Sequence, residues 1–85
     1  MTFHFVYVLQ QSNKQLYVGL TKDLRRRLKE HKSSKVKATS KRRPLKLIYY
    51  EAYRNKRDAE RRERYFKTTK GKRTLKIQLH NYLLE

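Results

Sequence analysis

Apolar and polar residues alternate along the first part of the chain, in a pattern typical of two short strands. Residues 3–9 are aromatic and β-branched, and their large side chains, Tyr7 among them, fall on one face. Residues 15–20 alternate in the same way and place Tyr17 on the face opposite the aliphatic residues. Because only the short polar segment 11–14 separates the two runs, we predict an antiparallel hairpin.

The pattern then changes to helical spacing and back to a strand. Thr21 and Asp23 compete as N-caps for a helix that should end near Ser33. Residues 33–43 are polar, basic and without a period, so we interpret them as a surface loop. Residues 45–52 are again aliphatic and aromatic, and they predict a third strand.

The last third of the chain has helical periodicity. Asn55, followed three residues later by Asp58, resembles the cap of a helix that runs to about Lys67. Residues 68–71 should break it, and the apolar spacing beyond them predicts one further amphipathic helix, best explained by packing. The predicted order is ββαβαα, an α/β fold that forms a single layered domain over residues 1–85.

The first predicted helix has two unexpected residues on its inward face. Leu24 and Leu28 mark that face, and steps of three and four residues put Arg27 and His31 beside them. The other polar residues, Glu30 included, should be solvated. A guanidinium cannot be deprotonated and is costly to remove from water, so Arg27 should face a negative group. His31 is either an ordinary packing residue or a hydrogen-bonding partner for a substrate or a tyrosine.

The second predicted helix shows the opposite anomaly. Glu63 lies between Ala59 and Phe66 on the apolar stripe, where a carboxylate needs a metal, a cation or several hydrogen bonds. A buried ion pair with an arginine and a metal site both remain open. Glu51 is ambiguous, because Leu47 and two tyrosines share its predicted strand face.

The charge of the chain indicates the class of partner. The 85 residues include 24 Lys and Arg against 7 Asp and Glu, a formal net charge of +17, and 12% are aromatic. A small domain this basic is typical of proteins that bind nucleic acid. No apolar stretch approaches the ~20 residues that cross a bilayer, and no signal sequence opens the chain. We therefore expect a soluble, cytoplasmic protein with no membrane association.

Composition also narrows the chemistry. The sequence has no cysteine, which excludes thiolate chemistry and cysteine-based zinc sites. Its two glycines cannot form a Gly-rich phosphate loop. Two-metal nucleases need several convergent carboxylates, and the 7 acidic residues, most of them assigned other roles, argue against such a site. One hydrated Mg²⁺, held by a single carboxylate and a substrate phosphate, is chemically sound.

Four short motifs, in order and at matching spacing, resemble those of the GIY-YIG nuclease superfamily. They are Val6-Tyr7-Val8, Tyr17-Val18-Gly19, residues 23–27 with His31, and Ala59 with Glu63. The likeness covers residues 3 to about 76. Within the superfamily, the chain is similar to small stand-alone proteins that resemble the amino-terminal catalytic domain of the UvrC excision-repair endonuclease. The first motif lacks its glycine and isoleucine, and the second has valine for isoleucine, but both tyrosines are present.

This resemblance implies a role for each motif residue. Tyr7 and Tyr17 match the two motif tyrosines, and Arg27 matches the catalytic arginine. Glu63 matches the metal-binding glutamate, and His31 matches a common family histidine. The resemblance also implies a three-stranded antiparallel sheet flanked by helices. The implied reaction is a one-metal hydrolysis, with Mg²⁺ or Mn²⁺, in which a tyrosine helps deprotonate the attacking water.

Together these observations predict a metal-dependent endonuclease that hydrolyses phosphodiester bonds in DNA, in repair or recombination. Basic residues of two segments should grip the nucleic-acid backbone: Arg26, Lys35, Lys37, Lys41, Arg42, Arg43, Lys67, Lys70 and Lys72. Three alternatives remain open, namely a non-catalytic nucleic-acid-binding module on the same scaffold, an RNA-processing nuclease, and a ribosome-associated basic protein.

Overall fold

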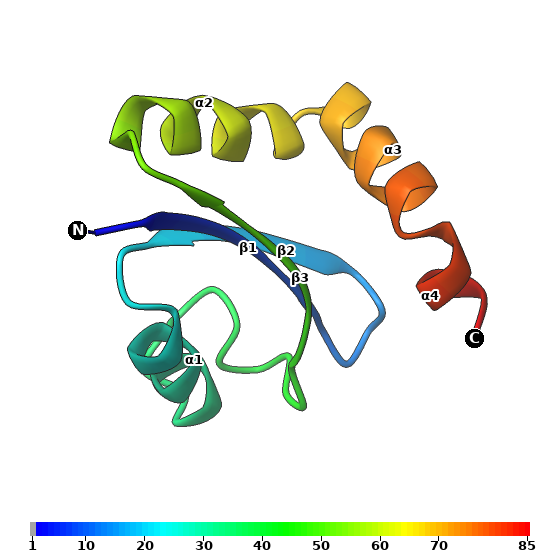
Figure 1. Ribbon diagram of the computed structural model, residues 1–85. Helices are drawn as coiled ribbons and strands as arrows, with labels where there is room; N and C mark the ends of the chain where they lie inside the picture. The colour runs from blue at the N-terminus through cyan, green and yellow to red at the C-terminus, as the bar shows by residue number, and fades with distance from the viewer. Residues whose placement is uncertain (1) are drawn as a thin grey trace.

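The predicted strands form one three-stranded antiparallel sheet, in the order β2-β1-β3 (Figure 1). The computed structural model describes residues 2–85. Its elements are β1 (His4–Gln10), β2 (Leu16–Thr21), α1 (Leu24–Lys32), β3 (Lys46–Tyr53), α2 (Lys56–Phe66), α3 (Thr69–Gln78) and α4 (His80–Leu84). The α/β class is confirmed. The order is ββαβααα, with one helix more than predicted.

The two faces of the sheet are covered by different helices. Figure 1 shows α1 on one face and α2 on the other. The main hydrophobic core lies on the α2 face, where β1 and β2 meet α2 and α3. Its buried members are Val6, Val8, Val18, Ala59, Phe66 and Leu75. Because side chains alternate along a strand, Tyr7 points from β1 to the opposite face, toward α1.

A bulge in β3 corrects the predicted strand face of Glu51. Val8 pairs with Tyr49, but the next residue, Leu9, pairs with Leu47, so Ile48 is an extra residue on β3. Leu47 therefore shares the face of Leu9, whereas Glu51 and Tyr49 face α2.

The fully buried residue of α1 is polar. Asp23 is the N-cap of the helix and accepts a hydrogen bond from the backbone N–H of Arg26, at 3.1 Å, which settles the competition with Thr21. Among the nine residues of α1, all of them described, His31 is the buried one. Leu28 is only half-buried, so the inward face of this helix is less apolar than its leucine spacing predicts.

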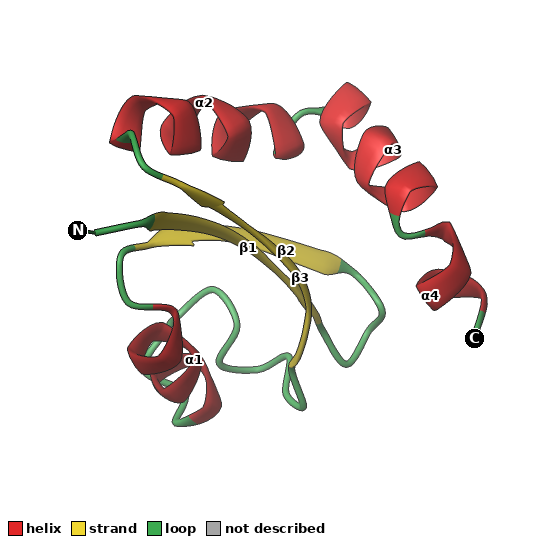
Figure 2. Cartoon of the chain, in the orientation of Figure 1, coloured by secondary structure: helices red, strands yellow, loops and turns green. Residues whose placement is uncertain are grey.

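The segment between α1 and β3 is not wholly a surface loop. Figure 2 shows it running back beside α1. Val36 and Thr39 lie buried within it, with 8% and 0% of their surfaces exposed. Most of the segment is exposed, as predicted for a surface loop, but Thr39 is buried because its hydroxyl is hydrogen-bonded to His31.

The carboxyl-terminal helices differ from the prediction in two places. The break after α2 is shorter than residues 68–71, because Thr68 caps α3 and accepts from the N–H of Gly71 at 3.0 Å. Gly71 is needed there, since a Cβ would lie 1.8 Å from the carbonyl oxygen of Tyr65. A second break at Leu79 turns α4 back, and the Tyr82 hydroxyl donates to Gln10 at 2.9 Å. Within the described residues, no helix has the length and apolar character to span a membrane.

Candidate active site

Four of the five predicted catalytic residues are in direct contact on the α1 face of the sheet. Tyr7 and Tyr17 come from adjacent strands, with ring centroids 6.4 Å apart. The His31 ring stands edge-on to both, at 5.7 Å from Tyr7 and 5.2 Å from Tyr17. Arg27, one turn before His31 on α1, reaches the Tyr7 hydroxyl with its side chain. The helical spacing that predicted a shared face for Arg27 and His31 is therefore confirmed.

Gly19 determines where the Tyr7 phenol lies. The two residues are cross-strand partners. A Cβ at position 19 would lie 2.3 Å from both Cζ and Oη of Tyr7. Glycine in a strand interior often marks such a close approach, so the phenol occupies the space that a side chain would fill. Tyr7 is 0% exposed.

The Tyr7 hydroxyl sits between a cation and an imidazole. Arg27 donates from Nε to Tyr7 Oη at 3.4 Å, and Nε2 of His31 lies 2.9 Å from the same oxygen. Burial raises the pKa of Tyr7, and the charges of Tyr17 and Glu63 add to this, while Arg27 opposes it. The phenol is therefore neutral around pH 7.

Arg27 is held from two sides but is not enclosed. Its Nη1 donates to Oε1 of Glu30 at 2.9 Å, and 35% of its side chain is exposed. Bonds to Glu30 and Tyr7 raise its pKa further, and Arg27 in turn lowers the pKa of Glu30. Glu30 is 31% exposed, so it is partly solvated as expected, but its carboxylate also turns back to this guanidinium. These two bonds use two of the five N–H donors of Arg27.

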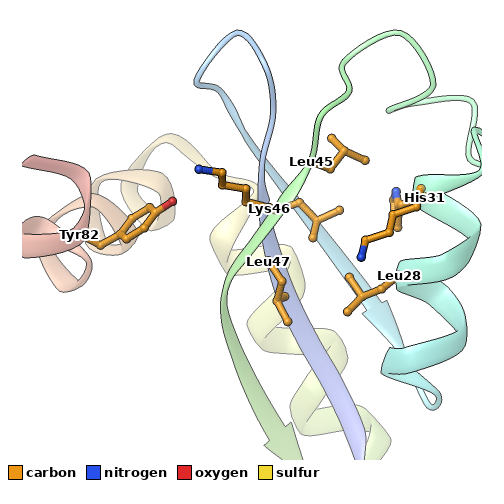
Figure 3. A pocket seen from close by; sticks show the side chains of 8 residues that line it. Leu28, His31, Leu45, Lys46, Leu47 and Tyr82 are labelled. Carbon is orange, nitrogen blue, oxygen red and sulfur yellow. The ribbon is translucent and has the colours of Figure 1, made fainter. Parts of the chain in front are cut away.

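His31 has a second hydrogen bond, on the far side of its ring. Nδ1 lies 2.7 Å from Oγ1 of Thr39, and the side chain is 1% exposed. Figure 3 shows His31 and Leu28 facing Leu45 and Leu47. These residues line a cavity of about 470 Å³. Burial lowers the pKa of His31, and the Arg27 charge lowers it further, so the imidazole is neutral at pH 7.

Glu63 is not part of this hydrogen-bonded cluster. It comes from α2, on the opposite face of the sheet, and within residues 2–85 no hydrogen bond joins it to the other four residues. Its carboxylate pairs with Lys67, one turn later, at 2.9 Å, and 20% of the side chain is exposed. The ion pair expected as an alternative is present, but with a lysine rather than an arginine. Glu63 is still close enough for its charge to raise the pKa of Tyr7.

The donor set near Glu63 suits one kind of metal site. Within the described residues there is no group of three or more His, Cys, Asp or Glu side chains that could enclose an ion. Glu63 is 20% exposed and its partner Lys67 is 54% exposed, and an exposed ion pair of this kind contributes little stability that an incoming ion would have to overcome. A hydrated Mg²⁺ needs only one or two protein carboxylates, because it keeps most of its waters. The residues present therefore fit a single ion shared with a phosphate.

The predicted phosphate-gripping residues fall into two groups. Arg26 and the cations of the 33–43 segment accompany α1, below the sheet in Figure 1, whereas Lys67, Lys70 and Lys72 surround the α2–α3 junction above it. All of these side chains are exposed. The two groups therefore cannot grip one point on a backbone, although each lies on the same face as one part of the predicted site.

Three residues that shape this cluster were hard to recognise from the sequence. Gly19 carried one usable signal, since a glycine inside a strand indicates a close approach. Thr39 lies in a segment without periodicity, and Glu30 looked like an ordinary exposed helix residue. Their roles follow from tertiary contacts alone.

A second polar cluster occupies the α2 face. Glu51 accepts from Nε and Nη2 of Arg62 at 3.0 and 3.1 Å, and from the hydroxyls of Tyr49 and Tyr53. The Arg62 guanidinium also lies 4.2 Å from the centre of the Phe66 ring. This cluster joins β3 to α2, and it resolves the ambiguity of Glu51 as a paired, half-buried carboxylate.

Comparison with known proteins points to one family. Residues 3–76 match the model of the GIY-YIG catalytic domain. A UPF0213 protein of Bacillus pumilus is 44% identical over 77 residues, which are 88% of this chain and 79% of the relative. One of Staphylococcus aureus is 37% identical over 78 residues, which are 91% of this chain and 95% of the relative.

A solved structure agrees with these sequence matches. The solution NMR structure of the UPF0213 protein BH0048 from Bacillus halodurans has a TM-score of 0.58 and 34% identity, and the match covers 91% of this chain and 84% of that one. A GIY-YIG domain indicates a nuclease, and nucleases of this family generally use divalent metals and act on nucleic acid. The chain belongs to the GIY-YIG catalytic domain family, among the proteins named UPF0213.

Proposed function

We propose that this chain is a metal-dependent endonuclease that cleaves phosphodiester bonds in DNA. The observation that carries the proposal is the contact of Arg27 with Tyr7 on a surface that Tyr17 also lines. This contact holds a partly exposed, permanently positive group in a fixed position, as a site for an anionic transition state requires.

Arg27 is proposed to stabilise the charge that develops on the phosphorus oxygens. Its bonds to Tyr7 and Glu30 fix the plane of the guanidinium and leave three N–H donors for a substrate. A single preorganised donor of this kind contributes about 3–4 kcal/mol to the transition state. Because Tyr7 is fully buried, we assign it the role of positioning Arg27 rather than of touching the substrate.

Tyr17 is proposed to orient or deprotonate the attacking water. Of the two motif tyrosines, it is the one that keeps part of its surface exposed. Its ring is packed against His31 at 5.2 Å, which limits the positions of its hydroxyl. His31 therefore acts through both tyrosines, as a positioning residue.

Glu63 is proposed to hold the divalent ion. Mg²⁺ or Mn²⁺ bound there would supply further positive charge at the phosphate and its leaving oxygen. Before the ion binds, Lys67 pairs with the carboxylate and holds it in place.

The substrate is proposed to be held by its backbone. The net charge of +17 and the two groups of exposed cations suit phosphate contacts, which position a nucleic acid without reading its sequence. We therefore expect structure-dependent rather than sequence-dependent cleavage, with affinity that falls as salt concentration rises.

The test is a cleavage assay with Mg²⁺ or Mn²⁺ on duplex, nicked, branched and single-stranded DNA and on matching RNA. Glu63→Gln should abolish cleavage and leave duplex affinity nearly unchanged. Glu60→Gln, on the preceding turn of the same helix, is the matched control and should behave as the wild type. Full activity of Glu63→Gln would refute the metal assignment. Binding without cleavage by the wild type would support a non-catalytic module instead, and cleavage confined to RNA would support an RNA-processing nuclease.

A further inference from the structure

The hydroxyl of Tyr7 belongs to a chain of hydrogen bonds that runs from α1 into the loop before β3. From Arg27 Nε to Tyr7 Oη the distance is 3.4 Å, and from Tyr7 Oη to His31 Nε2 it is 2.9 Å. From His31 Nδ1 to Thr39 Oγ1 it is 2.7 Å, and Thr39 Oγ1 donates to the Val36 carbonyl at 3.5 Å. The side chains of Tyr7, His31 and Thr39 are at most 1% exposed, so their hydrogen-bonding groups must be paired with one another rather than with solvent.

The direction of this chain can be deduced from its cationic end. Arg27 can only donate, so Tyr7 Oη accepts from it. The Tyr7 proton then needs an acceptor, and within the described residues the remaining partner of its oxygen is Nε2 of His31. Nε2 must therefore carry a lone pair, and the proton of the neutral ring is on Nδ1, where it is donated to Thr39.

The reverse direction leaves a buried donor without a partner. If Nε2 carried the proton, Tyr7 Oη would face two donors, from His31 and Arg27, and its own O–H would have no acceptor. In the structure, no buried side-chain nitrogen or oxygen of the described residues lacks a partner. A protonated imidazolium is disfavoured as well, because the ring is buried beside the positive charge of Arg27.

We propose that Thr39 is a positioning residue of the active site: its hydroxyl holds His31 in the Nδ1–H tautomer, so that Nε2 takes the Tyr7 proton and Tyr7 Oη receives Arg27. The identity of the ring nitrogen that bears the proton is set by the hydrogen bond at the other nitrogen. This inference rests on the proposed function only for its effect on cleavage, since the tautomer is a property of the protein alone.

The experiment records long-range ¹H–¹⁵N correlations of the histidine rings in ¹⁵N-labelled protein, above neutral pH and without metal or nucleic acid. The His31 signals are assigned by their loss in His31→Gln. The wild type should show the Nδ1–H pattern. Thr39→Val, which keeps the shape but removes the hydroxyl, should shift His31 to the Nε2–H pattern, and Thr39→Ser should restore the wild-type pattern.

The same variants are then compared in the cleavage assay. Thr39→Val should lower kcat by about tenfold, the lower end for loss of a residue that orients a site histidine, with little change in KM. Thr39→Ser should recover most of the rate. An Nε2–H pattern in the wild type would overturn the inference, and so would an unchanged tautomer in Thr39→Val. If Thr39→Val does not fold, the wild type and Thr39→Ser still decide, because both must show Nδ1–H.

The two proposals can fail separately. An Nδ1–H tautomer that depends on Thr39, in a protein that cleaves nothing, would leave the hydrogen-bond chain in place and refute the nuclease. Cleavage by a protein whose His31 is in the Nε2–H tautomer would support the nuclease and refute the proposed role of Thr39.

Discussion

Two polar clusters lie on opposite faces of the same sheet and differ in how completely their charges are paired. On the α1 face, Arg27 uses two of its donors within the protein and remains 35% exposed. On the α2 face, Glu51 accepts from Arg62 and from two tyrosines and is 15% exposed. Arg62 is itself 30% exposed and also uses two donors, so the difference lies in the carboxylates. Within the described residues, Glu30 is 31% exposed and accepts from Arg27 alone, whereas Glu51 is satisfied by three side chains.

The pKa shifts express the same difference. Burial alone would raise the pKa of Glu51, but the bonds from Arg62, Tyr49 and Tyr53 outweigh it and lower the pKa. Burial and the Glu51 bond raise the pKa of Tyr53 to about 12. In this cluster Glu51 is stabilised as the carboxylate and Tyr53 as the neutral phenol, so neither group readily changes its protonation state. A buried charge predicts a functional site only when its partners leave part of it unsatisfied.

The two clusters are also linked through α2. Arg62 holds α2 against β3, and the charge of the next residue, Glu63, raises the pKa of Tyr7. The Glu51 cluster on the α2 face, in which the carboxylate is satisfied internally (the closed cluster), thus fixes the helix that carries the proposed metal ligand. Its contribution to function would be structural.

Among the variants that test this contrast, Arg27→Ala should have the largest effect on the cleavage rate. The substitution should slow cleavage by about 10²–10³-fold, because it removes a preorganised donor from the transition state. Single-turnover cleavage of the best substrate in the panel measures the rate. Arg26→Ala, an exposed neighbour on the same helix, is the control and should weaken binding slightly without this loss. An equal, small effect of the two substitutions would reassign Arg27 to packing.

A second prediction tests the close contact beneath Tyr7. Gly19→Ala places a methyl group 2.3 Å from the Tyr7 ring, which has no free space to enter. We expect a loss of about 1–3 kcal/mol in the free energy of unfolding, as for other overpacked cores. Cleavage should fall as well, because Tyr7 can no longer meet Arg27. Urea unfolding and the cleavage assay measure the two effects, and an unchanged protein would show that β1 and β2 do not approach in this way.

The third prediction separates the two clusters directly. Glu51→Gln turns an amide toward the donors of Arg62 and leaves them partly unpaired, which should cost about 1–3 kcal/mol of stability. The cleavage rate of the folded fraction should change far less than in Arg27→Ala. The double variant Glu51→Leu with Arg62→Met should recover part of this stability, since a part-buried ion pair can be replaced by apolar residues at little cost, although the Tyr49 and Tyr53 hydroxyls lose their acceptor. A large rate loss at full folding would instead place Glu51 in the chemistry.

Regular patterns in the sequence predicted the helices and strands well, but they predicted only some of the contacts between them. Strand alternation and helical spacing located most elements to within one or two residues, and the 3.6-residue repeat put His31 on the buried face of α1. The bulge at Ile48 reversed part of a strand face, which no alternation could show. Thr39 meets His31 from a segment without any period. Such residues are set by tertiary packing, so they become visible only in three dimensions.

The smallest expected effect is on the pH dependence of the free energy of unfolding, which should differ between the two clusters. Burial, with Arg27, holds the pKa of His31 below its ordinary value of 6.5. The unfolded chain therefore binds a proton here that the folded protein does not, and stability should begin to fall as the pH drops through 6.5. The pKa of Glu51 is instead lowered from 4.5, so the stability it contributes is present above that pH and is lost as the pH falls through the folded value.

Urea unfolding across this pH range separates the two contributions. His31→Gln should remove the slope just below 6.5 and keep the fall in stability at more acid pH, because Glu51 is untouched. Glu51→Gln should remove part of the acid fall and keep the slope near 6.5. Since the two groups lie on opposite faces of the sheet, their effects should add in the double variant. A change of both slopes in either single variant would mean that the two clusters titrate together, and the contrast between an open and a closed cluster would no longer hold.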